Sequence, residues 1–200
     1  AWHSLEAHHL DGRALRRIFI THDHPDHMGL ARWLHERHGA RHFEITDETL
    51  SPKLLIRLAD ALVPHAAIRP RFVGYARFEP GFTPEACRRI HEMGMRKLFF
   101  GLESGNQAML DHMDKGIRLD VARAVLRNCV EAGIAVHVFS IVGFPEETED
   151  QARDTLAFLL GEQPTLEHPM NTFDVHPFGL DLRTEYGDER TPTAAADMLL

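Results

Sequence analysis

Four side chains of the kinds that bind metal ions lie close together near the amino terminus. They are His22, His24, Asp26 and His27, and they follow a short apolar segment. Alternate residues of an extended loop point the same way, so His22 and His24 are placed to bind one metal ion while Asp26 and His27 bind a second. This spacing predicts a metal site. The alternative is a histidine-rich polar turn that caps the following helix.

Two later stretches place polar residues directly after apolar segments. In the first, residues 98–102 run into Glu103 and Ser104, and in the second, residues 135–142 run into a glycine-bearing loop with Glu146. A carboxylate directly after a buried strand is costly unless solvent, a partner or a ligand satisfies it. A glycine-bearing loop that opens a helix also presents free backbone amides to a ligand. Both stretches therefore predict the rim of a ligand site.

Ser104 fits a second role as well. The spacing Ser104-x-x-Gln107 is that of a capping box, in which the serine closes the first turn of a helix. The sequence leaves both roles open, contact with a ligand and capping alone.

Strand and helix patterns alternate along the chain and would position these residues. The predicted strands are residues 17–20, 42–48, 72–76, 97–100, 135–142 and 171–175. Helices are predicted over residues 30–38 and 120–132, and from the caps Ser51-Pro52, Thr83-Pro84 and Thr148-x-x-Gln151. The alternation predicts an α/β fold with a mostly parallel sheet of about five or six strands flanked by helices. Ligands of such folds bind at the carboxyl ends of the strands.

The orientation of the first predicted strand determines at which edge of the sheet the histidine motif lies. Residues 17–20, the helix after Met28 and the strand at Phe43 form a plausible βαβ unit with a right-handed crossover. If the first strand joins the sheet in parallel, the histidine motif falls on the same edge as Asp47, Glu103 and Glu146. We therefore predict one common carboxyl rim.

Composition narrows the class of protein. The chain has 200 residues, which suits one domain, and a formal net charge of -8, which argues against non-specific nucleic-acid binding. Neither a membrane-spanning run nor a secretory signal pattern is visible. Cys87 and Cys129 lie in separate helix-like patterns and predict buried thiols in a reducing cytoplasm. Because the first residue is Ala1, we expect a fragment or a processed product.

The amino-terminal segment resembles the metal-binding signature of the metallo-β-lactamase superfamily. The resemblance rests on residues 20–30, which contain the histidine motif, and on residues 33–40. It implies zinc at His22, His24, Asp26 and His27 and a hydrolase activity. The remaining ligands of such a two-zinc site have no counterpart after Ala40.

Residues 42 to about 178 resemble the later part of the catalytic barrel of radical S-adenosylmethionine (SAM) enzymes, in the branch that often carries a cobalamin-binding domain. The matching stretches are residues 43–48, 99–105, 113–116, 132–134 and 141–148. The resemblance implies a partial (β/α) barrel and a small-molecule substrate. It also implies SAM contacts from Glu103, Ser104, Ile141, Gly143, Glu146 and Glu147. Phe139 occupies the first glycine position of the family's Gly-x-Ile-x-Gly-x-x-Glu pattern.

One family motif has no counterpart. Radical SAM enzymes hold a four-iron four-sulfur cluster through a Cys-x-x-x-Cys-x-x-Cys loop, whereas this chain has 2 cysteines. A cluster, and a cobalamin-binding domain, would therefore come from sequence outside this chain.

The two resemblances follow one another along the chain. We expect a metallo-β-lactamase-like segment over residues 1–40 packed on the same sheet, a partial radical SAM barrel over 41–180 and a peripheral tail over 181–200. A natural fusion, a wrongly joined gene model and an artificial chimera all fit this order. The leading functional prediction is a radical SAM-type protein, and the alternatives are a zinc hydrolase and a non-catalytic fragment.

Overall fold

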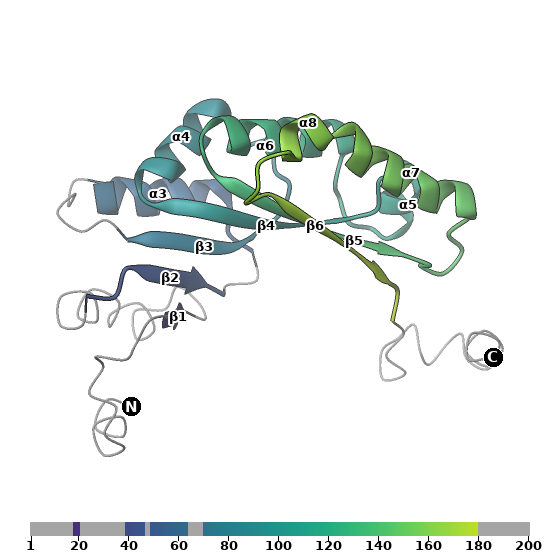
Figure 1. Ribbon diagram of the computed structural model, residues 1–200, viewed down its shortest axis with the longest axis horizontal. Helices are drawn as coiled ribbons and strands as arrows, with labels where there is room; N and C mark the ends of the chain where they lie inside the picture. Colours follow the sequence, from purple (N-terminus) through teal and green to yellow (C-terminus); the bar gives the residue numbers. More distant parts are fainter. Residues whose placement is uncertain (1–17, 21–38, 47–48, 64–69, 180–200) are drawn as a thin grey trace, which may run out of the picture.

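The fold is organised around one parallel sheet. The computed structural model describes residues 18–20, 39–46, 49–63 and 70–179 (Figure 1). Six strands pair in the order in which they occur in the chain, and every pairing is parallel. They are β1 (Ile18–Ile20), β2 (His42–Ile45), β3 (Arg71–Ala76), β4 (Met95–Glu103), β5 (Ala135–Val142) and β6 (Thr172–Pro177). The predicted α/β class and parallel sheet are confirmed.

Helices cover one face of this sheet, and the sheet arches over an open, concave face (Figure 1). The described helices are α3 (Pro52–Leu62), α4 (Pro84–Glu92), α5 (Gln107–His112), α6 (Leu119–Glu131), α7 (Glu149–Gly161) and α8 (Gln163–Leu166). Because all strands are parallel, their carboxyl ends share one edge of the sheet. The arched sheet with helices on its outer side is the architecture of a partial barrel.

The core lies between the sheet and the helices. In β4, Leu98, Phe100 and Leu102 are fully buried on the helix side, whereas Phe99 and Glu103 face the concave side. This alternation follows from the two-residue period of a strand. The odd-numbered residues from Lys97 to Glu103 are thus left free to line a site.

The helix starts follow the capping signals. Ser51 and Thr83 each accept a hydrogen bond from the backbone N–H three residues on, with proline in the first turn. Thr148 and Gln151 form a complete capping box at the start of α7. These three predicted starts are confirmed, because capping depends only on residues within one turn.

Of the two roles left open for Ser104, the capping box is wrong. Helix α5 begins at Gln107, and its cap is Asn106, whose side chain accepts a hydrogen bond from the N–H of Met109 at 3.0 Å. The preceding strand β4 also runs on to Glu103 rather than ending at Phe100. Ser104 is fully buried against α7, which draws its hydroxyl away from the first turn of α5.

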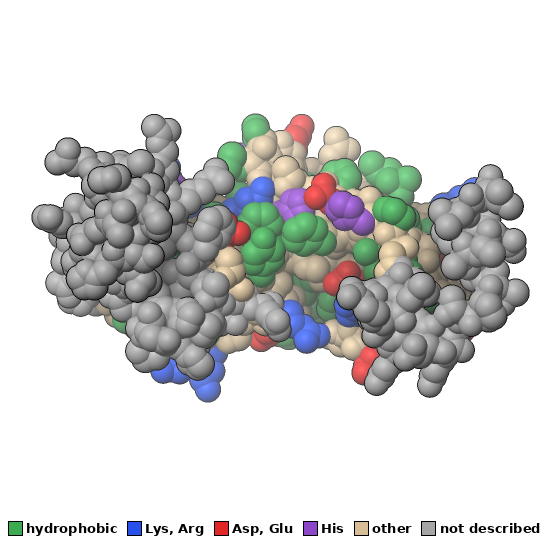
Figure 2. Space-filling view, turned by 90° about the horizontal axis from the view of Figure 1, so that it is seen from below, with side chains coloured by type: hydrophobic (Ala, Val, Ile, Leu, Met, Phe, Trp, Pro, Cys, Tyr) green, Lys and Arg blue, Asp and Glu red, His purple; other side chains and the backbone are tan. Residues whose placement is uncertain are grey.

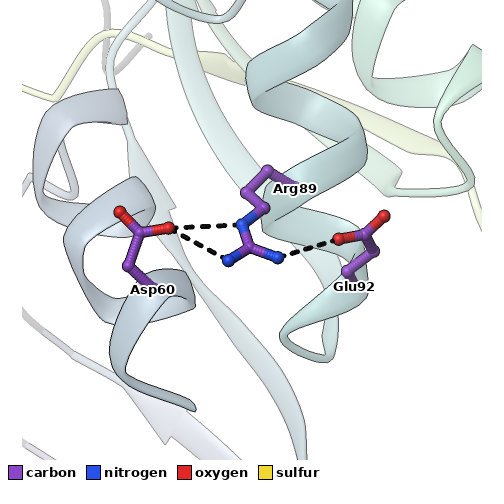
Figure 3. Close-up of polar contacts among 3 residues, drawn as sticks. All are labelled: Asp60, Arg89 and Glu92. Carbon is purple, nitrogen blue, oxygen red and sulfur yellow. Dashed lines mark hydrogen bonds and ion pairs between the residues drawn. The ribbon is translucent and has the colours of Figure 1, made fainter. Parts of the chain in front are cut away.

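Polar contacts on the outer surface join neighbouring helices. Arg89 of α4 donates to the carboxylate of Asp60 on α3 at 3.1 and 3.3 Å and to Glu92 at 3.2 Å (Figure 3). All three side chains are solvent-exposed, so this link contributes little to stability.

The two cysteines meet inside the helix layer. Cys87 of α4 and Cys129 of α6 are both fully buried, and their Sγ atoms lie 3.8 Å apart. The prediction of buried free thiols is confirmed. Their proximity was not predicted, because it depends on how α4 packs against α6.

The parallel pairing of β1 with β2 confirms the expected place of the first strand in the sheet. The metal motif (His22, His24, Asp26 and His27) lies outside the described residues, as do Asp47, the predicted helix over 30–38 and the tail from residue 181. Among the described helices, none is both long enough and apolar enough to cross a membrane.

Candidate functional site

A cavity of about 480 Å³ opens at the carboxyl ends of β3, β4 and β5. Its charged lining residues are Arg77, Glu103, Asp114 and Lys115. Aromatic side chains from the three strands form its wall on the concave face, namely Tyr75, Phe99 and Phe139. The predicted rim therefore coincides with a hollow that combines apolar walls with a few converging charges, the usual composition of a small-molecule site.

Glu103 is held in an unusual backbone conformation at the end of β4. Its φ is 68°, in the left-handed region that non-glycine residues rarely adopt, and the pairing with β5 shifts register between Gly101 and Glu103. The side chain folds back over Gly101, where an added Cβ would lie 2.7 Å from Glu103 Oε1. Gly101 thus makes room for this carboxylate, and the local strain is of the kind that gathers at functional sites.

One cation lies beside the Glu103 carboxylate, and a second contacts the backbone of the first. Lys115 Nζ is 3.4 Å from Glu103 Oε1, and Arg77 donates from its guanidinium to the carbonyl oxygen of Lys115. With Asp114, the cavity lining therefore holds two basic and two acidic residues. Sequence reasoning missed Arg77, although its position directly after β3 follows the same strand-to-rim pattern that singled out Glu103.

The second predicted edge adjoins the first. Glu103 pairs in register with Ser140 of β5, so the loop after β5 lies next to the cavity. Gly143 has a φ of 79° and donates its N–H to Glu147 Oε2, while the other oxygen of Glu147, Oε1, is buried and accepts no hydrogen bond from a described residue. That oxygen is free to accept from a ligand.

Glu146 and Ile141 complete this loop. Glu146 has a φ of 71° and its Oε2 lies 3.7 Å from His112 Nε2 at the end of α5. Ile141 is half-buried on the same face of β5 as Phe139. The loop after β5 and the end of α5 are thereby held together at the rim.

Ser104 does not face the cavity. Its hydroxyl lies 3.3 Å from Thr155 Oγ1 of α7 and accepts from the N–H of Asn106 at 3.1 Å. Gly105 donates to the same Thr155 oxygen at 2.8 Å. Ser104 and Gly105 therefore anchor the end of β4 to α7, and they act on the site by positioning Glu103.

A larger cavity, of about 700 Å³, lies at the opposite end of the sheet. Arg71, Arg96 and Lys97 line it, at or near the amino ends of β3 and β4. In parallel α/β folds the amino ends of the strands serve stability, whereas the loops at the carboxyl ends carry the ligand-binding groups. The smaller cavity is accordingly the candidate site.

The family assignment rests on a match that covers most of the chain. The sequence model of the Radical SAM superfamily matches residues 30–159. The chain belongs to the radical SAM superfamily. The predicted family is thereby confirmed, and the matched range begins inside the segment that the metallo-β-lactamase resemblance covers.

The chain is also similar to individual proteins. An uncharacterized methyltransferase of Pyrococcus horikoshii is 24% identical over 127 residues, which are 62% of this chain and 27% of that protein. Among solved structures, the radical SAM methyltransferase TsrM from Kitasatospora setae, with cobalamin and a [4Fe-4S] cluster bound, superposes with a TM-score of 0.62 and 21% identity. That match covers 81% of this chain and 30% of TsrM.

A further structural neighbour is the cobalamin-dependent SAM radical enzyme OxsB with aqua-cobalamin bound. It matches with a TM-score of 0.56 and 19% identity over 67% of this chain and 21% of OxsB. These likenesses show that the folds agree. The chain spans less than a third of the length of the relatives named here.

The superfamily implies SAM and an iron–sulfur cluster. The residues of this chain fit SAM but not the cluster. The rim cavity offers charged and apolar groups suited to SAM. The cluster does not fit, because Cys87 and Cys129 are both fully buried in the helix layer, away from the cavity. Of the described residues, no group of three or more His, Cys, Asp or Glu has the geometry of a metal site.

Proposed function

We propose that residues 41–180 form the SAM-binding wall of a radical SAM protein, with the nucleoside cofactor in the cavity at the carboxyl edge of the sheet. The observation that carries this proposal is the Glu103 carboxylate folded over Gly101 and flanked by Lys115. In this superfamily SAM supplies radical-based transformation of a substrate. The residues of this chain bind and orient it.

The charges of the cavity suit the two ends of SAM. Arg77 and Lys115 are placed to bind the carboxylate of its methionine part, because both are cations that line the cavity. Glu103 is an acceptor for the ribose hydroxyls. We assign Ile141, Gly143, Glu146 and Glu147 to the adenosine end, because the loop after β5 adjoins β4 at Glu103. Ser104 positions Glu103 through its contact with Thr155 of α7.

Other parts of the proposal concern what lies beyond this chain. The cysteines that hold the cluster come from another segment of a longer parent protein or from a partner polypeptide. A cobalamin-binding domain belongs to the same parent, as the cobalamin-containing neighbours support. The metallo-β-lactamase-like segment over residues 1–40 packs on the same sheet, as the pairing of β1 with β2 supports, and zinc at His22, His24, Asp26 and His27 stays a prediction. The substrate is a small molecule.

Calorimetric titration of SAM into the purified chain tests the proposal. Glu103→Gln keeps the shape of the side chain and removes its charge, and we expect it to weaken binding about tenfold, since a hydrogen bond to a charged group contributes about 1.5–3 kcal/mol. Glu85→Gln is the matched control, because Glu85 lies on α4 with 76% of its side chain exposed. Equal affinity in the parent and Glu103→Gln, or no binding by the folded parent, would overturn the proposal.

A further inference from the structure

His137 is buried on the concave face of the sheet, and one of its ring nitrogens has no hydrogen-bond partner among the described residues. Its side chain is 9% exposed, and its Nδ1 lies 2.6 Å from Thr172 Oγ1 of β6. The Nε2 atom is buried and makes no hydrogen bond with a described residue, although it lies 3.4 Å from Asp174 Oδ2. The contact with Thr172 fixes the orientation of the ring and leaves its other edge directed toward Asp174.

Asp174 lies between two imidazole rings. The same Oδ2 atom is 3.8 Å from His176 Nε2, on the same face of β6. No described residue donates a hydrogen bond to the Asp174 carboxylate, whose side chain is 51% exposed. Burial lowers the pKa of His137, which favours the neutral ring. The carboxylate therefore keeps its capacity to accept a hydrogen bond from a ligand.

Aromatic rings form a row beside this group. Tyr75 of β3 stacks on Phe99 of β4 with ring centroids 4.9 Å apart, and Phe99 stacks on Phe139 of β5 at 6.2 Å. His137 lies edge-on to Phe139 at 4.2 Å. Figure 2, which looks onto this face, shows hydrophobic, histidine and acidic side chains side by side in its open middle.

The aromatic row and the proposed cofactor cavity are continuous. Tyr75, Phe99 and Phe139 also line the cavity of about 480 Å³ that contains Glu103. A molecule lying on the rings would therefore be within reach of a ligand at the rim. The group around Asp174 lies on the next strand, at the far side of the row from β3.

We infer that this concave face binds the substrate, and that the substrate is a flat aromatic ring bearing an N–H or O–H donor, of the indole or phenol type. The inference rests on the proposed function, because it assigns the substrate to the face that adjoins the cofactor cavity. The ring packs against Phe99 and Phe139, and its donor binds the Asp174 carboxylate between the two imidazoles. In this assignment Asp174 binds the substrate and His137 positions Asp174.

The test compares two probes that differ by one donor. Indole and 1-methylindole have the same ring system, but only indole carries an N–H. We expect the parent chain to bind indole about tenfold more tightly in calorimetric titration, the effect of one hydrogen bond to a carboxylate. In Asp174→Ala we expect indole and 1-methylindole to bind with about equal affinity. Asp150→Ala is the matched control, because Asp150 is 93% exposed on α7.

The aromatic row has its own pair of variants. Phe99→Leu weakens binding of both probes to a similar degree, because it removes an aromatic contact and leaves Asp174 in place. Phe173→Leu makes the same substitution on the other face of the sheet, where Phe173 is 48% exposed, and leaves both affinities unchanged. Circular dichroism of each variant establishes that it is folded.

The outcomes separate the two proposals. If the folded parent binds SAM but binds indole and 1-methylindole equally, or binds neither, the substrate inference is overturned and the proposed function stands. If the folded parent fails to bind SAM, the proposed function falls, and the assignment of this face to the same reaction falls with it. Retained SAM affinity together with a lost indole preference in Asp174→Ala supports both.

Discussion

Glu103 Oε1 and Lys115 Nζ lie 3.4 Å apart across the mouth of the rim cavity, one at the end of β4 and the other in the loop after α5. The Glu103 side chain is 23% exposed and that of Lys115 is 41% exposed, so water screens the pair only in part. The contact holds two unlike charges at the place where the proposed cofactor binds. The position of the Glu103 carboxylate in this pair depends on the absence of a side chain at Gly101.

Gly101→Ala tests that dependence. The new Cβ would lie 2.7 Å from Glu103 Oε1, so the carboxylate must move away from its place beside Lys115. We expect SAM affinity to fall about tenfold, the equivalent of about 1.4 kcal/mol, with the fold retained because only the end of a side chain moves. Calorimetric titration measures the loss. Unchanged affinity would contradict the positioning of Glu103 described above.

Gly105→Ala should instead damage stability. An added Cβ would meet the Thr155 Cα at 2.6 Å and the Asp154 carbonyl oxygen at 2.7 Å, both of them backbone atoms of α7 that have no room to yield. We expect a loss of about 1–3 kcal/mol in the free energy of unfolding, measured by urea denaturation. Gly161→Ala is the control, since nothing lies within 4 Å of its new Cβ. A similar small effect in both variants would count against close packing at Gly105.

Thiol reactivity reports on the buried cysteine pair. The neighbouring Cys87 thiol and burial together raise the pKa of Cys129 well above its ordinary value, so its thiolate is scarce at pH 8. Because both thiols are fully buried, we expect each to react with a disulfide reagent only as fast as the chain unfolds. Adding urea should bring both into rapid reaction. Fast labelling of the native chain would show that the layer between α4 and α6 opens locally.

The stability of the fold should depend on pH through His137. Burial lowers the pKa of this imidazole below its unfolded value, so the folded state favours the neutral ring. Stability is then fully present above the unfolded pKa, near 6.5, and is lost as the pH falls below it. We expect the melting temperature to drop between pH 7.5 and 5.5, and to drop less in His137→Gln. An equal drop in both proteins would exclude this contribution.

Metal analysis addresses the histidine motif at residues 22–27. If His22 and His24 bind one ion, His22→Ala and His24→Ala should each reduce the zinc content of protein purified in the presence of zinc. His168→Ala is the control, because His168 is an exposed histidine far along the chain, after α8. Equal zinc in all of these proteins would leave the motif as a polar turn.

Local signals in the sequence determined most of the elements of the fold. The strand at residues 135–142 was predicted with its observed bounds, and the starts of α3, α4 and α7 were predicted from their capping residues. These features depend on periodicity and on hydrogen bonds within one turn, which residues close in sequence decide by themselves. The carboxyl rim followed from the same patterns, because parallel strands must end at one edge.

Tertiary structure decided which side chains act there. Ser104 has the spacing of a helix cap, yet packing against α7 binds its hydroxyl to Thr155 and gives the cap to Asn106. The register of β5 against β6 brings Asp174 beside His137, a contact that no spacing within one strand reveals. The sequence by itself determined the elements and the family motifs. Only the packing between distant segments, through register and close contact, determined which polar groups meet.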